Sequence, residues 1–132
     1  MNSPASDIAT YLDAQSALGL TAGTDLFYSH MPDGTDVPDL CVCVYDSGGE
    51  SPEDFDYWRP TFQVLVRGAR SGYDAAYDTI RAIAQTLHTA DFSATGARYI
   101  GIWQMGGIHS IGQDSSGRPR LTVNFRSHRT AT

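Results

Sequence analysis

The chain has 132 residues, of which 41% are hydrophobic and 18% charged, and its formal net charge at pH 7 is −6. This composition predicts one globular domain over residues 1–132 and argues against a disordered chain. No apolar run reaches the roughly 20 residues of a membrane helix, and the first residues lack the basic and apolar regions of a secretory signal. We therefore expect a soluble protein made in the cytoplasm, with no membrane partner. A net acidic chain is also a poor general DNA binder, because phosphate contacts need basic surface.

The charges are divided unevenly along the chain. Residues 1–58 hold 11 of the 15 acidic residues and no Arg or Lys, whereas residues 59–132 hold all nine Arg. If the two halves interleave in the fold, this asymmetry cancels in space. If they separate, the molecule has an acidic and a basic face, and it can dock head to tail with its copies or meet a partner of opposite charge.

The first third predicts a helix followed by two strands. An amphipathic helix is expected over residues 3–18, with Ser3 or Ser6 as N-cap and Gly19 at its end. Its inward stripe is Ile8, Tyr11, Leu12 and Leu18. Residues 25–30 and 40–45 have the composition of strands, and the segment 31–39 between them carries turn residues.

The two cysteines, Cys41 and Cys43, lie two residues apart in the second predicted strand. Side chains at this spacing share one face and are too far apart for ordinary disulfide geometry. A metal site would need two further soft ligands at suitable spacing, and the sequence offers none. We expect two packed, reduced thiols.

An acidic loop over residues 46–59 leads into the third strand, residues 60–67. In that strand Phe62, Val64 and Val66 should face the core, with Gln63, Leu65 and Arg67 on the opposite side. A helix is predicted over residues 71–90, with Ser71 as N-cap. Its inward stripe at helical spacing is Tyr73, Ala76, Tyr77, Ile80, Ile83, Ala84 and Leu87.

The last third predicts three strands, over residues 97–105, 107–114 and 120–128. Gly106 and Gly107, between the first two, could form a tight turn or a bulge. In the last strand Leu121, Val123 and Phe125 should face inward, and residues 126–132 could form a basic, flexible tail. The order α-β-β-β-α-β-β-β predicts an α+β fold, with a largely antiparallel sheet and two main helices packed on one face.

The sequence carries no convincing catalytic, metal or cofactor motif. The four histidines are scattered over separate predicted elements, and no nucleotide-binding glycine motif occurs. His109, Ser110 and Asp114 are the residue types of a hydrolytic triad, so a small hydrolase remains a remote alternative. The acids after Tyr45 lack the register of a calcium-binding loop. We expect no enzyme and no cofactor.

Three short motifs in the middle of the chain, within about residues 36–90, carry a resemblance. A strand led by a proline ends in Tyr-Asp-x-Gly-Gly (Pro38 to Gly49), and a strand with Gln among apolar residues ends in Arg-Gly (Pro60 to Gly68). A helix then begins with Tyr-x-x-Ala-Tyr (Tyr73 to Tyr77). This order resembles the phage family often labelled minor capsid protein, which is similar to the tail terminators of long-tailed bacteriophages.

The resemblance implies a virion protein of the tail and neck that forms a closed ring, usually hexameric, on the head-proximal end of the tail tube. Such a ring ends tube polymerisation and offers a surface to the head-side stopper or adaptor proteins. DNA would only pass through its lumen, which favours acidic lining residues and no sequence-specific binding. The family brings no catalytic residue. Another neck component, such as a stopper or head-completion protein, is the main alternative, and a monomeric ligand-binding module is a further one.

The acidic loop has the composition of an interaction surface, because aromatic residues anchor interfaces and acids steer partners. The alternative is that its aromatic residues fold back over the sheet. A basic counterpart is expected near the C-terminus. The predicted partner-binding residues are Asp46, Glu50, Glu53, Asp54, Phe55, Asp56, Tyr57 and Trp58 in the loop, and Arg118, Arg120, Arg126 and Arg129 in the basic region.

Overall fold

A computed structural model describes residues 1–34, 36–50 and 57–132. The helices are α1 (Pro4–Asp13), the short 3₁₀ helix η1 (Ser16–Leu18) and α2 (Tyr73–Leu87). The strands are β1 (Leu26–Tyr28), β2 (Cys41–Gly49), β3 (Tyr57–Trp58), β4 (Pro60–Arg67), β5 (Phe92–Ala94), β6 (Ala97–Gln113) and β7 (Pro119–Ala131). Among the described residues, no helix has the length and apolar character needed to cross a membrane.

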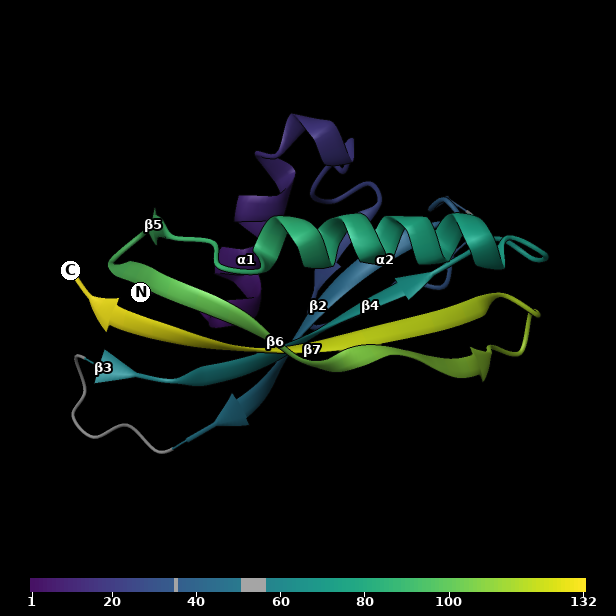
Figure 1. The fold of residues 1–132 in the computed structure, drawn as a ribbon. Helices are drawn as coiled ribbons and strands as arrows, with labels where there is room; N and C mark the ends of the chain where they lie inside the picture. Colours follow the sequence, from purple (N-terminus) through teal and green to yellow (C-terminus); the bar gives the residue numbers. More distant parts are fainter. Residues whose placement is uncertain (35, 51–56) are drawn as a thin grey trace.

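All seven strands belong to one twisted sheet. The order is β1-β2-β4-β7-β6-β5, and β3 pairs with β7 beside this path. The β1–β2 pair is parallel, whereas the other pairs are antiparallel. Both α1 and α2 lie on the same side of the sheet (Figure 1). The predicted α+β fold is therefore confirmed.

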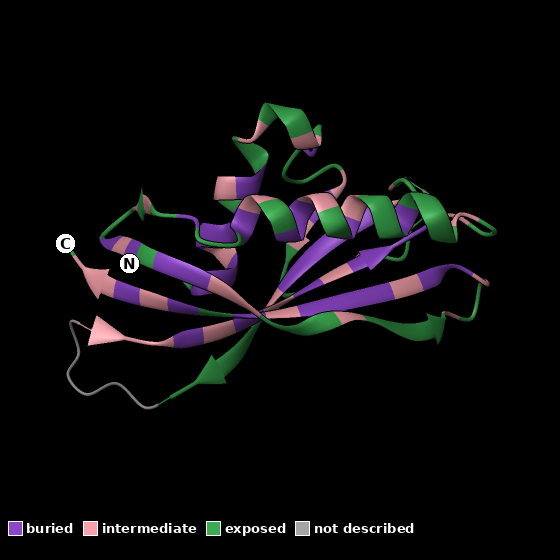
Figure 2. Ribbon diagram, in the orientation of Figure 1, coloured by how far each residue is buried: buried purple, intermediate pink, exposed green. Residues whose placement is uncertain are grey.

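The core lies between the helices and one face of the sheet, as Figure 2 shows. The predicted inward residues of β4 and β7 are all buried, and Phe62 stacks on Phe125 across the two strands with ring centroids 5.2 Å apart. The helices complete the core with Ile8 and Leu12 from α1 and Ile80, Ile83 and Leu87 from α2. Burying each such side chain contributes about 1.5–3 kcal/mol before the entropy of ordering it is subtracted.

The two helices differ from the prediction at their ends. Ser3 caps α1 as predicted, since its side chain accepts a hydrogen bond from the Ser6 backbone, but α1 stops at Asp13. Ser71 is not the cap of α2. The N-cap position is Gly72, which has no side chain that could cap the helix. Ser71, one residue earlier, has a φ of 63°.

Tyr73 and Tyr77 were predicted to face the core, and this was wrong. They remain 43% and 40% exposed, whereas Ala76 and Ile80 are fully buried. A helix packed on one face of a sheet buries only one stripe of its side chains, and residues at the flank of that stripe stay in contact with solvent.

The predicted strands 97–105 and 107–114 form one continuous strand, β6. The pairing of β6 with β7 shifts register between Met105 and His109, around Gly106 and Gly107. The glycine pair therefore lies in a bulge, not in a turn, and the strand continues beyond it to the hairpin that leads into β7.

Residues 126–131 belong to β7, so the predicted flexible tail is instead part of the sheet. Its side chains anchor this end of the strand. The hydroxyl of Ser127 donates a hydrogen bond to the Pro60 carbonyl at 2.9 Å, and Arg129 is only 2% exposed.

Cys41 and Cys43 are free and buried, as predicted. They lie on the sheet face opposite the helices, where Cys41 pairs with Arg67 of β4. Arg67 was predicted to point away from the core, and it does, but it is only 2% exposed. Its guanidinium donates hydrogen bonds to the carbonyls of Pro32, Pro38 and Asp39, so the segment between β1 and β2 covers this end of the face.

Candidate interaction surfaces

The uneven charge of the sequence is largely balanced within the protomer. Among the described residues, five ion pairs join an arginine of the second half to an acid of the first half, and they are Arg59–Glu50, Arg67–Asp33, Arg118–Asp33, Arg118–Asp39 and Arg129–Asp7. The arginines that remain without an ion pair in the described part of the chain are therefore the better candidates for meeting a partner.

Arg118 is an internal anchor. Its guanidinium donates hydrogen bonds to Asp114 at 2.8 Å and to Asp33 at 2.7 Å, and its side chain is only 10% exposed. Burial works against the ionised form of Asp114, but hydrogen bonds from the Arg118 backbone and guanidinium outweigh it and hold the pKa of that carboxyl below its usual value. This cluster ties the β6–β7 turn to the segment that precedes β2.

Arg129 is buried in a second cluster, beside α1. Its guanidinium lies 3.6 Å from Oδ2 of Asp7, contacts the backbone carbonyl of Asn2, and packs over the rings of Trp58 and Tyr99. The hydroxyl of Tyr99 donates to Asp7 at 2.8 Å. Burial raises the pKa of Asp7, although the hydrogen bond from Tyr99 and the charge of Arg129 oppose that shift. Asp7 lies in the first turn of α1, and no local signal in the sequence points to its buried partners.

Arg120 and Arg126 lie closer to solvent. Arg120 is half-buried, and its guanidinium donates to the carbonyls of Ile111 and Gln113 at 3.5 and 3.2 Å, which reinforces the β6–β7 hairpin. Arg126 is exposed, with its guanidinium carbon 5.8 Å from the ring centroid of Trp103. Within the described residues Arg126 makes no ion pair.

The described residues of the acidic loop make contacts with α1 and with one another. Asp46 accepts a hydrogen bond from the backbone of Ala5 at 2.9 Å, at the start of α1. Glu50 is exposed and pairs with Arg59 at 3.0 Å. Trp58 is half-buried, and its indole nitrogen donates to the Glu50 carbonyl at 3.1 Å. Glu53, Asp54, Phe55 and Asp56 lie outside the described residues.

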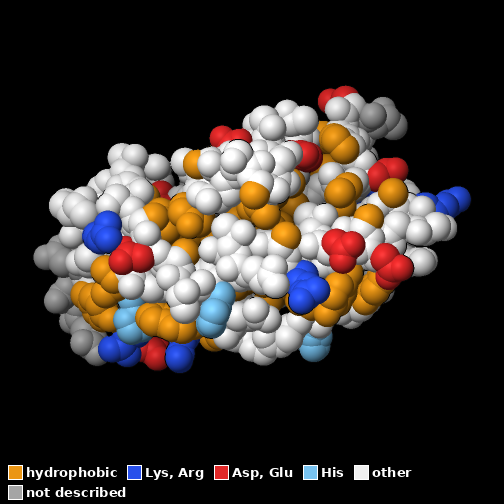
Figure 3. All heavy atoms as spheres, turned by 45° about the horizontal axis from the view of Figure 1, so that its top comes forward, with side chains coloured by type: hydrophobic (Ala, Val, Ile, Leu, Met, Phe, Trp, Pro, Cys, Tyr) orange, Lys and Arg blue, Asp and Glu red, His pale blue; other side chains and the backbone are white. Residues whose placement is uncertain are grey.

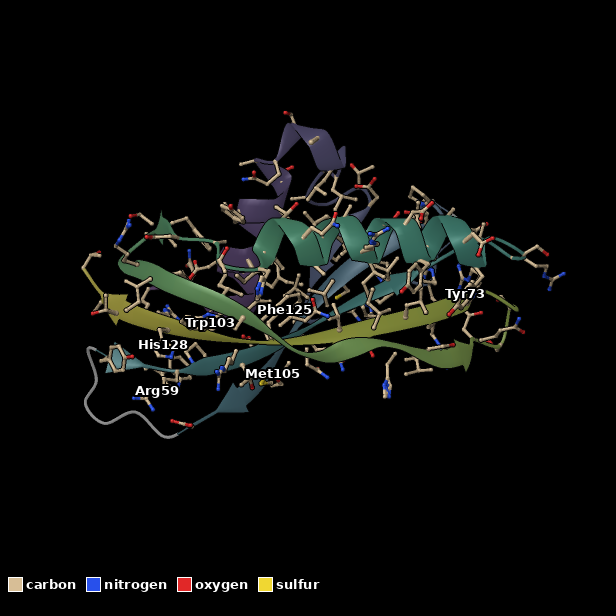
Figure 4. All side chains as sticks on the ribbon, viewed as in Figure 1. Arg59, Tyr73, Trp103, Met105, Phe125 and His128 are labelled. Carbon is tan, nitrogen blue, oxygen red and sulfur yellow. The ribbon has the colours of Figure 1, made fainter. Side chains whose placement is uncertain are left out.

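An aromatic and cationic surface lies on the sheet face that the helices leave open. We call it the open sheet face and define it by Trp103 and Met105 of β6 and Asn124, Arg126 and His128 of β7. The hydroxyl of Tyr57 and Nδ1 of His128 form a hydrogen bond of 2.6 Å, and the His128 ring meets the Trp103 ring edge-on at 4.8 Å between centroids. Met105 is 39% exposed. Figure 4 shows Trp103, Met105 and His128 together, with Arg59 nearby.

The electrostatic environment of this face is positive. Burial and the neighbouring charges of Arg59 and Arg126 lower the pKa of His128, while Glu50 opposes the shift. A positive field of this kind favours an acidic partner.

A second exposed surface lies on α2. We call it the tyrosine ridge and define it by Tyr73, Asp74, Tyr77 and Asp78. The rings of Tyr73 and Tyr77 stack with centroids 6.4 Å apart, and both acids are exposed. Figure 3, which turns the helix side towards the viewer, shows hydrophobic and acidic side chains close together on this side of the molecule.

The residues of the possible triad do not form one among the described contacts. His109 pairs with Thr122 and Ser110 with Leu121 in the β6–β7 ladder, so the two neighbours belong to opposite faces of the sheet. The Asp114 carboxylate is engaged by Arg118 and the Ser116 backbone. Across residues 1–34, 36–50 and 57–132, no group of His, Cys, Asp or Glu is arranged to hold a metal ion.

Comparisons with solved structures show where this fold occurs. One chain in a solved structure titled "Virion of native gene transfer agent (GTA) particle" superposes with a TM-score of 0.75 at 16% identity, covering 97% of this chain and 95% of that one. Another solved chain is similar at a TM-score of 0.53 and 11% identity, with 95% and 96% of the two chains covered. At these identities the matches show a shared fold. No curated protein sequence matches the chain.

A family model decides the identity. The model described as "Bacteriophage tail terminator protein" matches residues 15–130, which include α2 and all of the sheet except the last residue of β7. This family and this fold make the protein a structural component of a phage tail. The chain belongs to the bacteriophage tail terminator protein family.

Proposed function

We propose that this protein is a tail terminator that forms a ring, with six copies as the expected number, at the head-proximal end of the tail tube. The ring ends polymerisation of the tube protein and presents the surface to which head-side proteins attach. The observation that carries this proposal is the family match over residues 15–130. The similarity of the fold to a chain of a gene transfer agent virion particle supports it.

The decisive experiment is electron microscopy of tails from phage that lack this protein. Tails longer than normal would support the terminator role, because tube polymerisation would then continue past its set length. Tails of normal length that fail to join heads would instead identify a head-side neck protein, such as a stopper. The mass of the purified protein, or of the assembly on isolated tails, measured by light scattering tests for the closed ring.

The acidic loop is the proposed contact with a neighbouring protomer or ring. Glu50 is exposed at its start, and Trp58 at its end is half-buried beside the buried Arg129. Reversing Glu53 and Asp54 to Arg should block docking on the tail while the protomer stays folded. An unchanged yield of joined particles would remove the loop from the interface.

On this proposal the protein is assembled in the host cytoplasm and becomes part of the virion. DNA passes through the ring lumen without sequence-specific contacts, and acidic residues would line that passage, because like charge prevents the DNA from sticking. The chain performs no chemistry, so His109→Ala should leave tail assembly and head joining unchanged. Loss of joining in that variant would reopen the hydrolase alternative.

A further inference from the structure

We propose that neighbouring copies of this chain meet through the tyrosine ridge of one protomer and the open sheet face of the next. This inference rests on the proposed function, because it names the two surfaces that would meet within the ring. The tyrosine ridge is aromatic and acidic, whereas the open sheet face is aromatic and cationic, so the two surfaces complement each other in charge.

The two tyrosines of the tyrosine ridge lie outside the hydrophobic core of the described protomer. Tyr73 and Tyr77 are 43% and 40% exposed, and the helix already packs on the sheet through Ala76, Ile80 and Ile83. Large aromatic side chains that lie on the surface, outside the hydrophobic core, are typical anchors of protein interfaces. The carboxylates of Asp74 and Asp78 beside them make no hydrogen bond or ion pair within the described part of the chain, so their negative charge remains available.

The open sheet face offers the opposite chemistry. Arg126 is exposed and lies over the Trp103 ring, so its charge is held in place but is not neutralised by an acid among the described residues. Met105 adds an exposed flexible apolar side chain, and Asn124 adds an amide. Phenol rings can pack on Trp103 and Met105 while the aspartates approach Arg126.

The positions of the two surfaces favour head-to-tail association. The ridge lies on the helix side of the sheet and the open sheet face on the opposite side, and Figure 4 places Tyr73 far from Trp103 and His128. Contacts between two different surfaces of the same chain are heterologous, and they close into a ring when the rotation between neighbours allows it. A second copy is therefore the occupant that completes both surfaces at once.

Crosslinking on isolated tails tests the contact directly. Arg81→Cys places a thiol one helical turn beyond Tyr77, and Met105→Cys places one on the open sheet face. With both substitutions in one chain, a short bismaleimide should link protomers into a ladder of covalent oligomers. Pairing Met105→Cys with Tyr28→Cys gives the matched control, because Tyr28 is 51% exposed on β1, outside both surfaces. The native cysteines are buried and should not react.

Charge reversal gives an independent readout. Arg126→Asp alone, or Asp74→Arg with Asp78→Arg, should lower the amount of protein retained on tails by at least about tenfold, and combining the three changes should restore part of it. Tyr77→Ser should also lower retention, whereas Tyr28→Ser should not. Circular dichroism of each purified variant checks that it is folded.

The outcomes separate this inference from the proposed function. Tails that end at normal length with no crosslink between positions 81 and 105, or with equal crosslinking in the Tyr28→Cys control, would overturn the inference and leave the terminator role intact. Normal tails in the absence of the protein would overturn the terminator role itself.

Discussion

The hydroxyl of Tyr99 in β6 donates a hydrogen bond of 2.8 Å to Oδ2 of Asp7 in α1, although 92 residues separate them in sequence. Asp7 is 3% exposed and Tyr99 is fully buried, so this bond joins the N-terminal helix to β6 in the interior of the protein. Arg129 lies against the same carboxylate. The three side chains form a buried polar cluster, and the loss of one partner would leave a buried polar group without its hydrogen bond or counter-charge.

Tyr99→Phe should lower the free energy of unfolding by about 1–3 kcal/mol, because it leaves a buried carboxylate short of one donor. Urea denaturation at pH 7 measures the change. Tyr28→Phe is the matched control, since that ring is 51% exposed, and it should change stability by less than about 0.5 kcal/mol. Equal effects in the two variants would show that the Tyr99 bond does not stabilise the fold.

The raised pKa of Asp7 makes a prediction about pH. Burial raises this pKa above 3.8, so in the range between the unfolded and the folded value the folded protein binds more protons than the unfolded one. The contribution of Asp7 to stability is therefore most favourable at low pH and falls as the pH rises through that range. Asp7→Asn keeps an acceptor for Tyr99 and should abolish this dependence.

Denaturation curves of Asp7→Asn and the native protein, taken from pH 4 to pH 8, measure the difference. The difference between the free energies of unfolding of the two proteins should include a constant part, because Arg129 loses its counter-charge in the variant. The test is how this difference changes with pH, since the variant should gain stability relative to the native protein as the pH rises. A difference that stays the same at every pH would show that the Asp7 pKa is not raised.

Arg67→Ala should lower the free energy of unfolding by about 2–5 kcal/mol, because three backbone carbonyls of the segment between β1 and β2 lose a charged donor. The same variant should be cleaved faster by protease in residues 29–40. Arg70→Ala is the control, since Arg70 donates to a single carbonyl, that of Ser116, near the surface. Protease resistance equal to that of the native protein would refute the anchoring role of Arg67.

The neighbouring glycines at the end of β2 should respond differently to alanine. Both have positive φ, 87° at Gly48 and 104° at Gly49, a backbone conformation that costs a residue with a side chain about 1–2 kcal/mol. A Cβ at Gly48 would meet open space, whereas one at Gly49 would lie 2.4 Å from the Arg59 carbonyl oxygen. Gly49→Ala should therefore destabilise by about 2–4 kcal/mol, clearly more than Gly48→Ala. Thermal unfolding followed by circular dichroism compares the two, and similar midpoints would contradict this geometry.

Local patterns in the sequence determined the regular core of this protein. Alternation placed Phe62, Val64 and Val66 inward in β4, and the 3.6-residue period placed Ile80 and Ile83 on the buried stripe of α2. These patterns work because each depends only on the periodicity of one element and on one buried face. The resemblance of the short motifs to phage proteins is confirmed by a family match that covers them.

The tertiary structure alone decided which charges remain available for partners. Arg118 and Arg129 look like Arg126 in sequence, yet the first two are buried against acids from the other half of the chain and only Arg126 is exposed on the open sheet face. Tyr73 and Tyr77 follow the helical period of the core but lie at its flank. Periodicity gives the direction of a side chain within its element, whereas burial and charge pairing depend on which distant segment covers it, and that is fixed only when the sheet assembles.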